Sequence, residues 1–276
     1  MKICIEQMKP VLGDTEKNLL KMVEGIERAI EAGNDIIVFP ELSLNGYMLE
    51  ELVFDTAIRE VPQILLEKSK EISIIFGAAE IGAEEYPYNT AFYLEDGKVV
   101  HKHRKVYLPT YGMFQEGRYF MEGDKIRAFD TKFGRIGMLV CEDAWHQSAH
   151  YILAQDGAKH IFIISNAPAK IGVNRHDISS RWRNILKNSS MLNGVYTIMA
   201  NRVGVEDGVT FFGNSTVVDP CGEVVEEAEF FKEQSLCCCT SESKIRAARI
   251  GAPMFKAEKL DMTIRELKRI QKNRFE

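Results

Sequence analysis

The chain of 276 residues has no apolar run long enough to cross a membrane, no basic block and no segment rich in proline, glycine or serine. A membrane-spanning helix needs about 18 or more consecutive apolar residues. Lysine and arginine number 35 against 40 aspartates and glutamates, and the resulting net charge of −5 argues against nucleic acid as a partner. The chain is therefore predicted to form one domain that binds neither membrane nor nucleic acid.

Cysteine is scarce for a disulfide-stabilised protein, because six residues are spread over the whole chain. Disulfide frameworks are typical of short secreted chains, and Lys9-Pro10 interrupts the N-terminal apolar segment before it resembles a secretory signal. Three cysteines are consecutive, Cys237 to Cys239, and successive side chains on a strand point to opposite faces. They are therefore predicted to be small strand residues rather than ligands of one metal ion, in a cytoplasmic protein with free thiols.

What the sequence contains throughout is an alternation of short apolar strands and amphipathic helices. Between Thr15 and Ala32 the apolar residues recur at helical spacing, and Gly33-Asn34 ends the pattern. Strands are predicted at 35–39, 72–78, 90–94, 98–101, 134–141, 160–165, 195–200, 214–218, 223–225 and 236–240. Helices are predicted at 15–32, 62–70, 147–156, 178–192 and 262–275. The pattern indicates an α/β protein in which helices cover mixed strands.

Cys141 stands where the apolar strand Gly134-Arg-Ile-Gly-Met-Leu-Val140 changes abruptly to Glu142 and Asp143. A buried strand has no use for two carboxylates, so the chain must leave the core at this point. In α/β proteins the carboxyl ends of strands present reactive side chains. Cys141 is therefore a candidate nucleophile, although many free cysteines are inert core residues.

Two other charged segments occupy comparable positions. Glu41 follows the strand 35–39, and the loop after His103 contains Lys105 and Glu116. If the strands that carry Glu41 and Cys141 are neighbours, a carboxylate and a thiol meet at one edge. A thiol with an ordinary pKa near 8.5 needs a base, which Glu41 can supply, and Lys105 can stabilise an oxyanion.

Each candidate also has a purely structural interpretation, and the residues alone leave these alternatives open. Glu41 could cap the turn after Pro40, and Lys105 could belong to a solvated run of charges with Lys102 and Arg104. His101 and His103 share a strand face, which allows two metal ligands but offers no third. Tyr47 and Tyr111 could line a pocket or pack in a loop.

Three segments together resemble the nitrilase (carbon–nitrogen hydrolase) superfamily, whose signature is a Glu, a Lys and a Cys in that order. They are Phe39-Pro-Glu41, with Gly46-Tyr47 following, Arg104-Lys105, with Leu108-Pro109 following, and Cys141-Glu-Asp-Ala-Trp145. The segments 200–204, 212–215 and 219–222 also match blocks of that superfamily. The resemblance covers roughly residues 1–240. It implies a four-layer α-β-β-α sandwich, with 241–276 as an extension whose charged helix packs on the same or a neighbouring subunit.

The resemblance also implies roles. Cys141 is expected to be the nucleophile, Glu41 the general base and Lys105 the oxyanion stabiliser, while Glu116 positions the lysine and the substrate. Tyr47, Tyr111, Asn166 and Glu142 are expected to bind substrate, Glu142 through its backbone N–H. The resemblance implies a small amide as substrate and a homodimer or larger homo-oligomer. It implies no metal and no organic cofactor.

The Lys105 and Cys141 segments are similar to the glutamine-hydrolysing domain of glutamine-dependent NAD synthetase. The segment Ser165-Asn-Ala-Pro-Ala169 lacks a second small hydroxyl residue associated with glutamine recognition there. No phosphate-binding loop follows, so a synthetase activity is not expected in this polypeptide. Arginines between 175 and 183 could receive a substrate carboxylate. The prediction is hydrolysis of a small aliphatic, possibly carboxylated amide through a thioester, with an N-carbamoyl amidohydrolase or an ammonia-supplying glutaminase-like subunit as alternatives.

Overall fold

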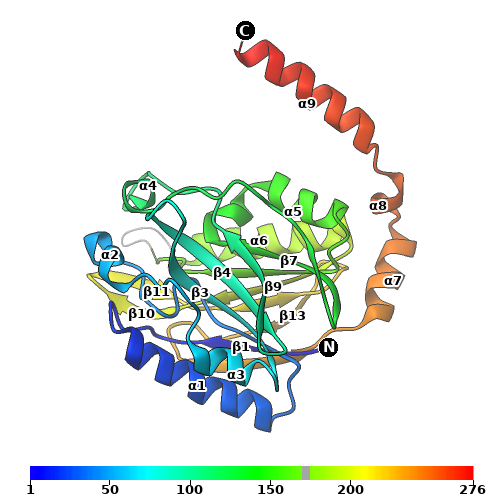
Figure 1. Cartoon of the computed structure of the whole chain (residues 1–276). Coiled ribbons are helices and arrows are strands. Elements are labelled where there is room, and N and C mark those ends of the chain that lie inside the picture. The colour runs from blue at the N-terminus through cyan, green and yellow to red at the C-terminus, as the bar shows by residue number, and fades with distance from the viewer. Residues whose placement is uncertain (170–174, 276) are drawn as a thin grey trace.

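The computed structural model describes residues 1–169 and 175–275, and within these residues the strands form two six-stranded sheets (Figure 1). We call them sheet A and sheet B. Sheet A has the strand order β14 (Gln234–Cys239), β1 (Lys2–Gln7), β2 (Ile36–Val38), β3 (Ser73–Ile81), β4 (Pro87–Glu95) and β5 (Lys98–Arg104). Sheet B has the order β13 (Val224–Glu227), β12 (Thr216–Val218), β9 (Tyr196–Asn201), β8 (His160–Ser165), β7 (Gly134–Val140) and β6 (Phe129–Thr131).

The two sheets have the same internal plan. Three parallel strands form the centre of each sheet, β1–β2–β3 in sheet A and β7–β8–β9 in sheet B. Antiparallel strands extend the sheet on both sides. Because the parallel strands of each sheet point the same way, their carboxyl ends meet at one edge, which is where α/β proteins place their functional side chains.

Helices cover the outer faces of the sandwich (Figure 1). Helix α1 packs on sheet A through the buried residues Met22, Ile26 and Ala29. Helices α5 and α6 pack on sheet B, with Leu153 and Leu186 in their apolar interface. The helices are α1 (Thr15–Glu31), α2 (Val53–Thr56), α3 (Gln63–Lys68), α4 (Glu116–Tyr119), α5 (Gln147–Gln155), α6 (Arg175–Asn193), α7 (Glu242–Gly251), α8 (Met254–Ala257) and α9 (Leu260–Phe275).

The core lies between the two sheets, where side chains from both inner faces interdigitate. Ile3, Val38 and Tyr93 of sheet A meet Met138 and Phe162 of sheet B, and all five are fully or almost fully buried. These layers are α-β-β-α, which confirms the predicted fold class. None of the helices in the described part of the chain has the length and apolar character that a membrane span requires.

Several elements were absent from the predictions. The N-terminal strand β1 lies inside sheet A, and the short ribbon β10 (Val203–Glu206) with β11 (Val209–Phe212) stands apart from both sheets. Helix α7 was also absent. The three consecutive cysteines lie on β14, where Cys238 is buried and its two neighbours are exposed, and all six cysteines are free thiols.

The segment after residue 240 leaves the sandwich progressively. Ile245 of α7 is still buried in the core between the sheets, and Arg249 donates to the backbone carbonyl of Gly194 at 3.1 Å. Helix α9 then extends away from the body of the molecule (Figure 1). Its apolar residues Ile264 and Leu267 are exposed to 42% and 59%.

Candidate active site

Glu41, Lys105 and Cys141 lie just beyond the ends of β2, β5 and β7. The strands β2 and β7 belong to different sheets, so the condition considered from the sequence, that the strands of Glu41 and Cys141 are neighbours, is not met within one sheet. The two strand ends face each other across the sandwich instead. The site is therefore assembled from both sheets.

Lys105 is the centre of a buried ionic cluster. Its ammonium Nζ donates to Glu41 Oε1 at 2.8 Å and to Glu116 Oε1 at 2.7 Å, and the lysine side chain is fully buried. Burial opposes the charged form, but the carboxylates of Glu116 and Glu41 hold the pKa of Lys105 well above its ordinary value. The interpretation of Lys105 as part of a solvated charge run is therefore wrong.

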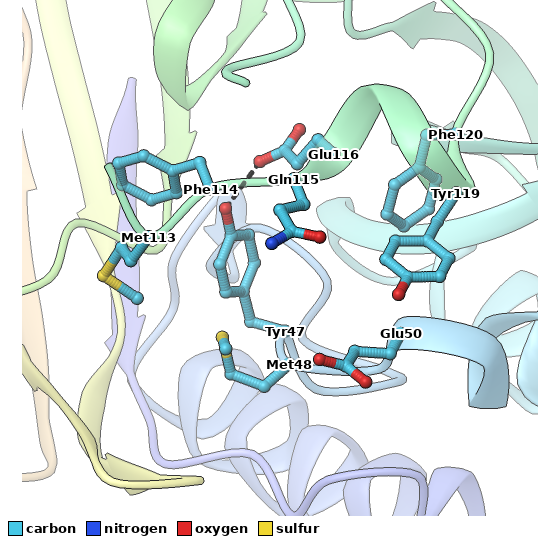
Figure 2. A pocket seen from close by; sticks show the side chains of 9 residues that line it. All are labelled: Tyr47, Met48, Glu50, Met113, Phe114, Gln115, Glu116, Tyr119 and Phe120. Carbon is cyan, nitrogen blue, oxygen red and sulfur yellow. Dashed lines mark hydrogen bonds between the residues drawn. The ribbon is translucent and has the colours of Figure 1, made fainter. Parts of the chain in front are cut away.

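Glu116 connects the lysine to Tyr47, whose hydroxyl donates to Glu116 Oε1 at 2.6 Å (Figure 2). Burial raises the pKa of Glu116 to about 7, although Lys105 opposes this shift. Its second oxygen, Oε2, is buried without a hydrogen-bond partner among the described residues. Tyr47 and Glu116 face a cavity of about 80 Å³ whose lining does not include Cys141.

Glu41 is fully buried and held by three donors. Oε1 accepts from Lys105 and from the side-chain amide of Asn89 at 2.8 Å, while Oε2 accepts from the backbone N–H of Asn166 at 2.8 Å. A residue that merely caps an exposed turn would not be buried among such partners. The side-chain amide of Asn166 is itself buried, and neither its oxygen nor its nitrogen has a hydrogen-bond partner in the described structure.

Cys141 begins a short 3₁₀ helix, Cys141–Trp145, directly after β7. Its φ angle of 46° lies in the left-handed region that few residues other than glycine adopt, which marks a locally strained backbone. Ser165 Oγ donates to the sulfur at 3.4 Å. Burial, with a contribution from Glu41, raises the pKa of the Cys141 thiol well above its ordinary value, and Lys105 opposes that shift. The resting thiol is therefore protonated at neutral pH.

Cys141 borders a cavity of about 170 Å³, which is small compared with the pockets of drug-sized ligands. Tyr111 lines it and donates to both carboxylate oxygens of Glu142 at 2.9 Å. Arg181 also lines it, whereas the side chain of Arg175 lies outside the described part of the structure. The apolar part of the wall consists of Phe114, Trp145, Ala167, Pro168, Ile178 and Trp182.

The two histidines considered as metal ligands have other partners. The ring of His101 stacks on Phe129 at a centroid distance of 4.1 Å, and His103 donates through Nε2 to Asp143. In the described part of the chain, no three side chains of His, Cys, Asp or Glu are grouped so that they could hold a metal ion.

Sequence reasoning missed several residues that hold the site together. Asn89 donates a hydrogen bond to Glu41, and Ser165 donates one to the sulfur of Cys141. Asp143 accepts a hydrogen bond from the backbone next to Lys105. Arg202 and Glu206 form a buried ion pair at 2.7 Å, and Glu206 accepts from the backbone N–H of Tyr47. The signal available for Asp143 was its place two residues after Cys141, but no pattern in the sequence indicated its partners.

Two stacked mixed sheets carry a thiol, a lysine and two carboxylates at one edge, and the carbon-nitrogen hydrolase family model matches residues 2–252. The chain belongs to the carbon-nitrogen hydrolase family. It is 31% identical over 236 residues to glutamine-dependent NAD(+) synthetase from Acinetobacter baylyi, which covers 84% of this chain and 43% of that protein. The chain thus spans less than half the length of such relatives.

Two other relatives match along nearly their whole length. A protein named a probable nitrilase from Schizosaccharomyces pombe is 27% identical over 243 residues, which covers 84% of this chain and 85% of that protein. The solved carbon-nitrogen hydrolase from Helicobacter pylori G27 superposes with a TM-score of 0.86 at 24% identity, covering 98% of this chain and 99% of that one. The resemblance to the nitrilase superfamily stated from the sequence is confirmed.

Proposed function

We propose that the chain is an amidase in which Cys141 attacks the carbonyl carbon of a small amide. The observation that carries this proposal is the buried Lys105 ammonium, which bonds to both Glu41 and Glu116 next to the thiol. Because burial keeps the Cys141 thiol protonated, a base must accept its proton as sulfur attacks. Glu41 is the base, because three hydrogen-bond donors fix its position and its charge contributes to the raised pKa of the Cys141 thiol.

The proposed reaction has two halves. In the first, the proton moves from Sγ to Glu41, the C–S bond forms, and the oxyanion is stabilised by Lys105 and by the backbone N–H of Glu142. Glu41 then returns the proton to the leaving nitrogen, the C–N bond breaks, and ammonia departs from a thioester. In the second, water attacks the thioester while Glu41 accepts its proton. The acid leaves as that proton returns to sulfur.

The cavity next to Cys141 supports a small substrate. Its volume of about 170 Å³ suits an aliphatic amide, and Tyr111, Glu142 and Arg181 are the polar side chains in its wall besides the thiol. In this proposal Arg181 would receive a substrate carboxylate, and Glu142 would accept from a substrate donor. Asn166 does not line this cavity; its side-chain amide is buried beside Glu41 and has no hydrogen-bond partner among the described residues.

A second candidate function is an ammonia-supplying glutaminase-like subunit of a separate synthetase. The observation that favours it is the 31% identity to a glutamine-dependent NAD(+) synthetase, of which this chain covers 43%. The third reaction considered from the sequence, hydrolysis of an N-carbamoyl amine, uses the same cluster with a carbamoyl carbon in place of the amide carbon.

The test is ammonia release from a panel of aliphatic amides, glutamine, N-carbamoyl compounds and nitriles. We expect turnover of amides, abolished in Cys141→Ala, and a covalent acyl adduct on Cys141 in rapid-quench mass spectra. Ser165→Ala is the matched control, because it removes a neighbour of the sulfur while keeping the nucleophile. Turnover of glutamine that rises on addition of an ATP-dependent synthetase would favour the subunit. A wild-type protein as inactive as Cys141→Ala on every class would refute a hydrolase.

We also propose that the protein is a homo-oligomer in which α9 packs on a neighbouring subunit. Helix α9 leaves the body of its own subunit, yet it keeps the exposed apolar residues Leu260, Ile264 and Leu267 on one stripe. A helix of this kind gains stability when its apolar stripe is covered.

A reducing, cytoplasmic location, proposed from the free thiols, is compatible with a catalytic cysteine.

A further inference from the structure

Sheet A and sheet B meet mainly through apolar side chains, which attract one another without a preferred direction. Glu41 and Lys105 follow strands of sheet A, whereas Cys141 follows β7 of sheet B. A reaction that uses all three groups therefore requires directional contacts that hold the ends of the two sheets in register.

Asp143 accepts four hydrogen bonds through one carboxylate, and three of them come from the segment at the end of β5 in the other sheet. Oδ1 accepts hydrogen bonds from the backbone N–H groups of Val106 and Tyr107, both at 3.0 Å. Oδ2 accepts from Nε2 of His103 at 2.8 Å and from the backbone N–H of Val140 at 3.1 Å. The side chain is fully buried, so these four donors take the place of water.

The donors lie next to the groups that must meet. Three of them are within two residues of Lys105 along the chain, and the fourth immediately precedes Cys141. Burial opposes ionisation of Asp143, but the hydrogen bond from His103 and those from the backbone hold its pKa below the ordinary range. Asp143 is therefore ionised at neutral pH, and hydrogen bonds to an ionised acceptor are roughly twice as strong as those between neutral groups.

We propose that Asp143 is a positioning residue that joins the end of β5 to the end of β7 and so fixes the Lys105 ammonium relative to the Cys141 thiol. The inference rests on the proposed function, because this placement matters for reactivity when both groups act on one carbon. Asp143 does not line the cavity next to Cys141, so it acts through the residues that it holds.

The opposite end of the sandwich provides a matched control. Glu95 is a buried carboxylate at the far end of β4, where it accepts from the Tyr93 hydroxyl at 2.9 Å and from the backbone N–H of Lys132 at 3.2 Å. Lys132 lies in the turn between β6 and β7, so Glu95 also links the two sheets. Glu95→Gln weakens one link between the sheets without touching the site.

The experiment compares Asp143→Asn with Glu95→Gln and wild type. The side-chain amide of asparagine keeps the size of the carboxylate but replaces one acceptor with a donor, so it opposes the donors that faced that oxygen. Two readouts are measured on folded protein: the rate of Cys141 alkylation by iodoacetamide between pH 6 and 9, followed by peptide mass spectrometry, and kcat and KM on the amide identified in the panel. Alkylation needs no substrate, so this readout stays valid if the proposed function fails.

We expect both variants to lower the melting temperature, whereas only Asp143→Asn changes the pH profile of alkylation and lowers kcat about 10- to 100-fold at similar KM. That range corresponds to a displacement of reacting groups by up to about 1 Å. His103→Leu, which removes one of the four donors, should give a smaller loss that His103→Gln restores; this pair remains informative if Asp143→Asn does not fold. Wild-type alkylation and kcat in folded Asp143→Asn, or equal losses in Glu95→Gln, would overturn the proposal.

Discussion

Replacing Tyr47 by phenylalanine isolates one hydrogen bond of the ionic cluster. The ring packs edge-on against Phe114 and Phe211 with centroid distances of 6.5 and 5.9 Å, so phenylalanine fills the same space. The variant loses the 2.6 Å hydrogen bond to Glu116 Oε1 and leaves that oxygen with Lys105 at 2.7 Å.

The magnitude of the effect depends on the charge of Glu116. Burial raises the pKa of Glu116 to about 7 against the opposing effect of Lys105, so the acceptor is a neutral carboxyl at pH 5 and a carboxylate at pH 8.5. A hydrogen bond between neutral groups contributes about 0.5–1.5 kcal/mol, and one to a charged group about 1.5–3 kcal/mol. Tyr47→Phe should therefore lower the free energy of unfolding by roughly 1 kcal/mol more at pH 8.5 than at pH 5.

The sign follows from linkage. A carboxyl whose folded pKa exceeds its unfolded value stabilises the fold below the unfolded pKa, and this stabilisation is lost as pH rises through the folded pKa, here about 7. The Tyr47 hydroxyl favours the ionised form, so its removal raises the pKa of Glu116 further, by about one unit for each 1.4 kcal/mol. The wild type and Tyr47→Phe should thus both lose stability between pH 5 and pH 8.5, and the variant should lose more.

The assay is urea unfolding of wild type and Tyr47→Phe at both pH values. It is repeated in a Glu116→Gln background, where the pH dependence of the Tyr47 effect should disappear. A destabilisation that is equal at the two pH values, or larger at pH 5, would show that Tyr47 does not stabilise an ionised Glu116.

Two further changes test the placement of Glu41 and the role of α9. In Gly77→Ala, the new Cβ would lie 2.4 Å from Leu42 N and 2.8 Å from Glu41 Cα, so the backbone that carries Glu41 must move. We expect a loss of about 1–3 kcal/mol in unfolding free energy and a large fall in kcat. In the control Gly137→Ala, the atoms nearest to the new Cβ belong to the Leu153 side chain, and kcat should be kept. An unchanged kcat in Gly77→Ala would show that this close contact does not fix the position that Glu41 needs for catalysis. Light scattering of the wild type should give a mass that is a multiple of 31.4 kDa. The double variant Ile264→Asp/Leu267→Asp should have the mass of a monomer, whereas Arg265→Gln, on the polar face of α9, should keep the wild-type mass. A monomeric wild type would contradict the assembly.

Local patterns in the sequence predicted much of the fold. The helical spacing from Thr15 to Ala32 corresponds to α1, and the apolar segment ending at Val140 corresponds to β7. The N-terminal strand was missed because Lys2-Ile-Cys-Ile-Glu-Gln7 gains its identity from partners far away in the sequence. The distribution of strands between two sheets depends on such pairings, so the sequence did not show that the strands of Glu41 and Cys141 lie in different sheets.

In the candidate site, too, some residues could be predicted from the sequence and others could not. Glu41, Lys105 and Cys141 were recognisable because charged or reactive side chains follow apolar strands. Asn89 lies inside β4 among apolar residues, and nothing in the spacing of that strand links its amide to Glu41. Contacts of this kind depend on the stacking of two sheets, which short-range periodicity does not record.

The position of β1 between β14 and β2 has a consequence for the order of folding during synthesis. Ile3 pairs with Ile36 on one side and with Cys238 on the other, so one edge of β1 stays unpaired until the polypeptide has grown by about 200 further residues. At translation rates of about 5–20 residues per second, that delay lasts on the order of ten seconds or more. An unpaired apolar strand edge invites pairing with other chains, so the nascent polypeptide is most vulnerable to aggregation in the interval before β14 emerges from the ribosome.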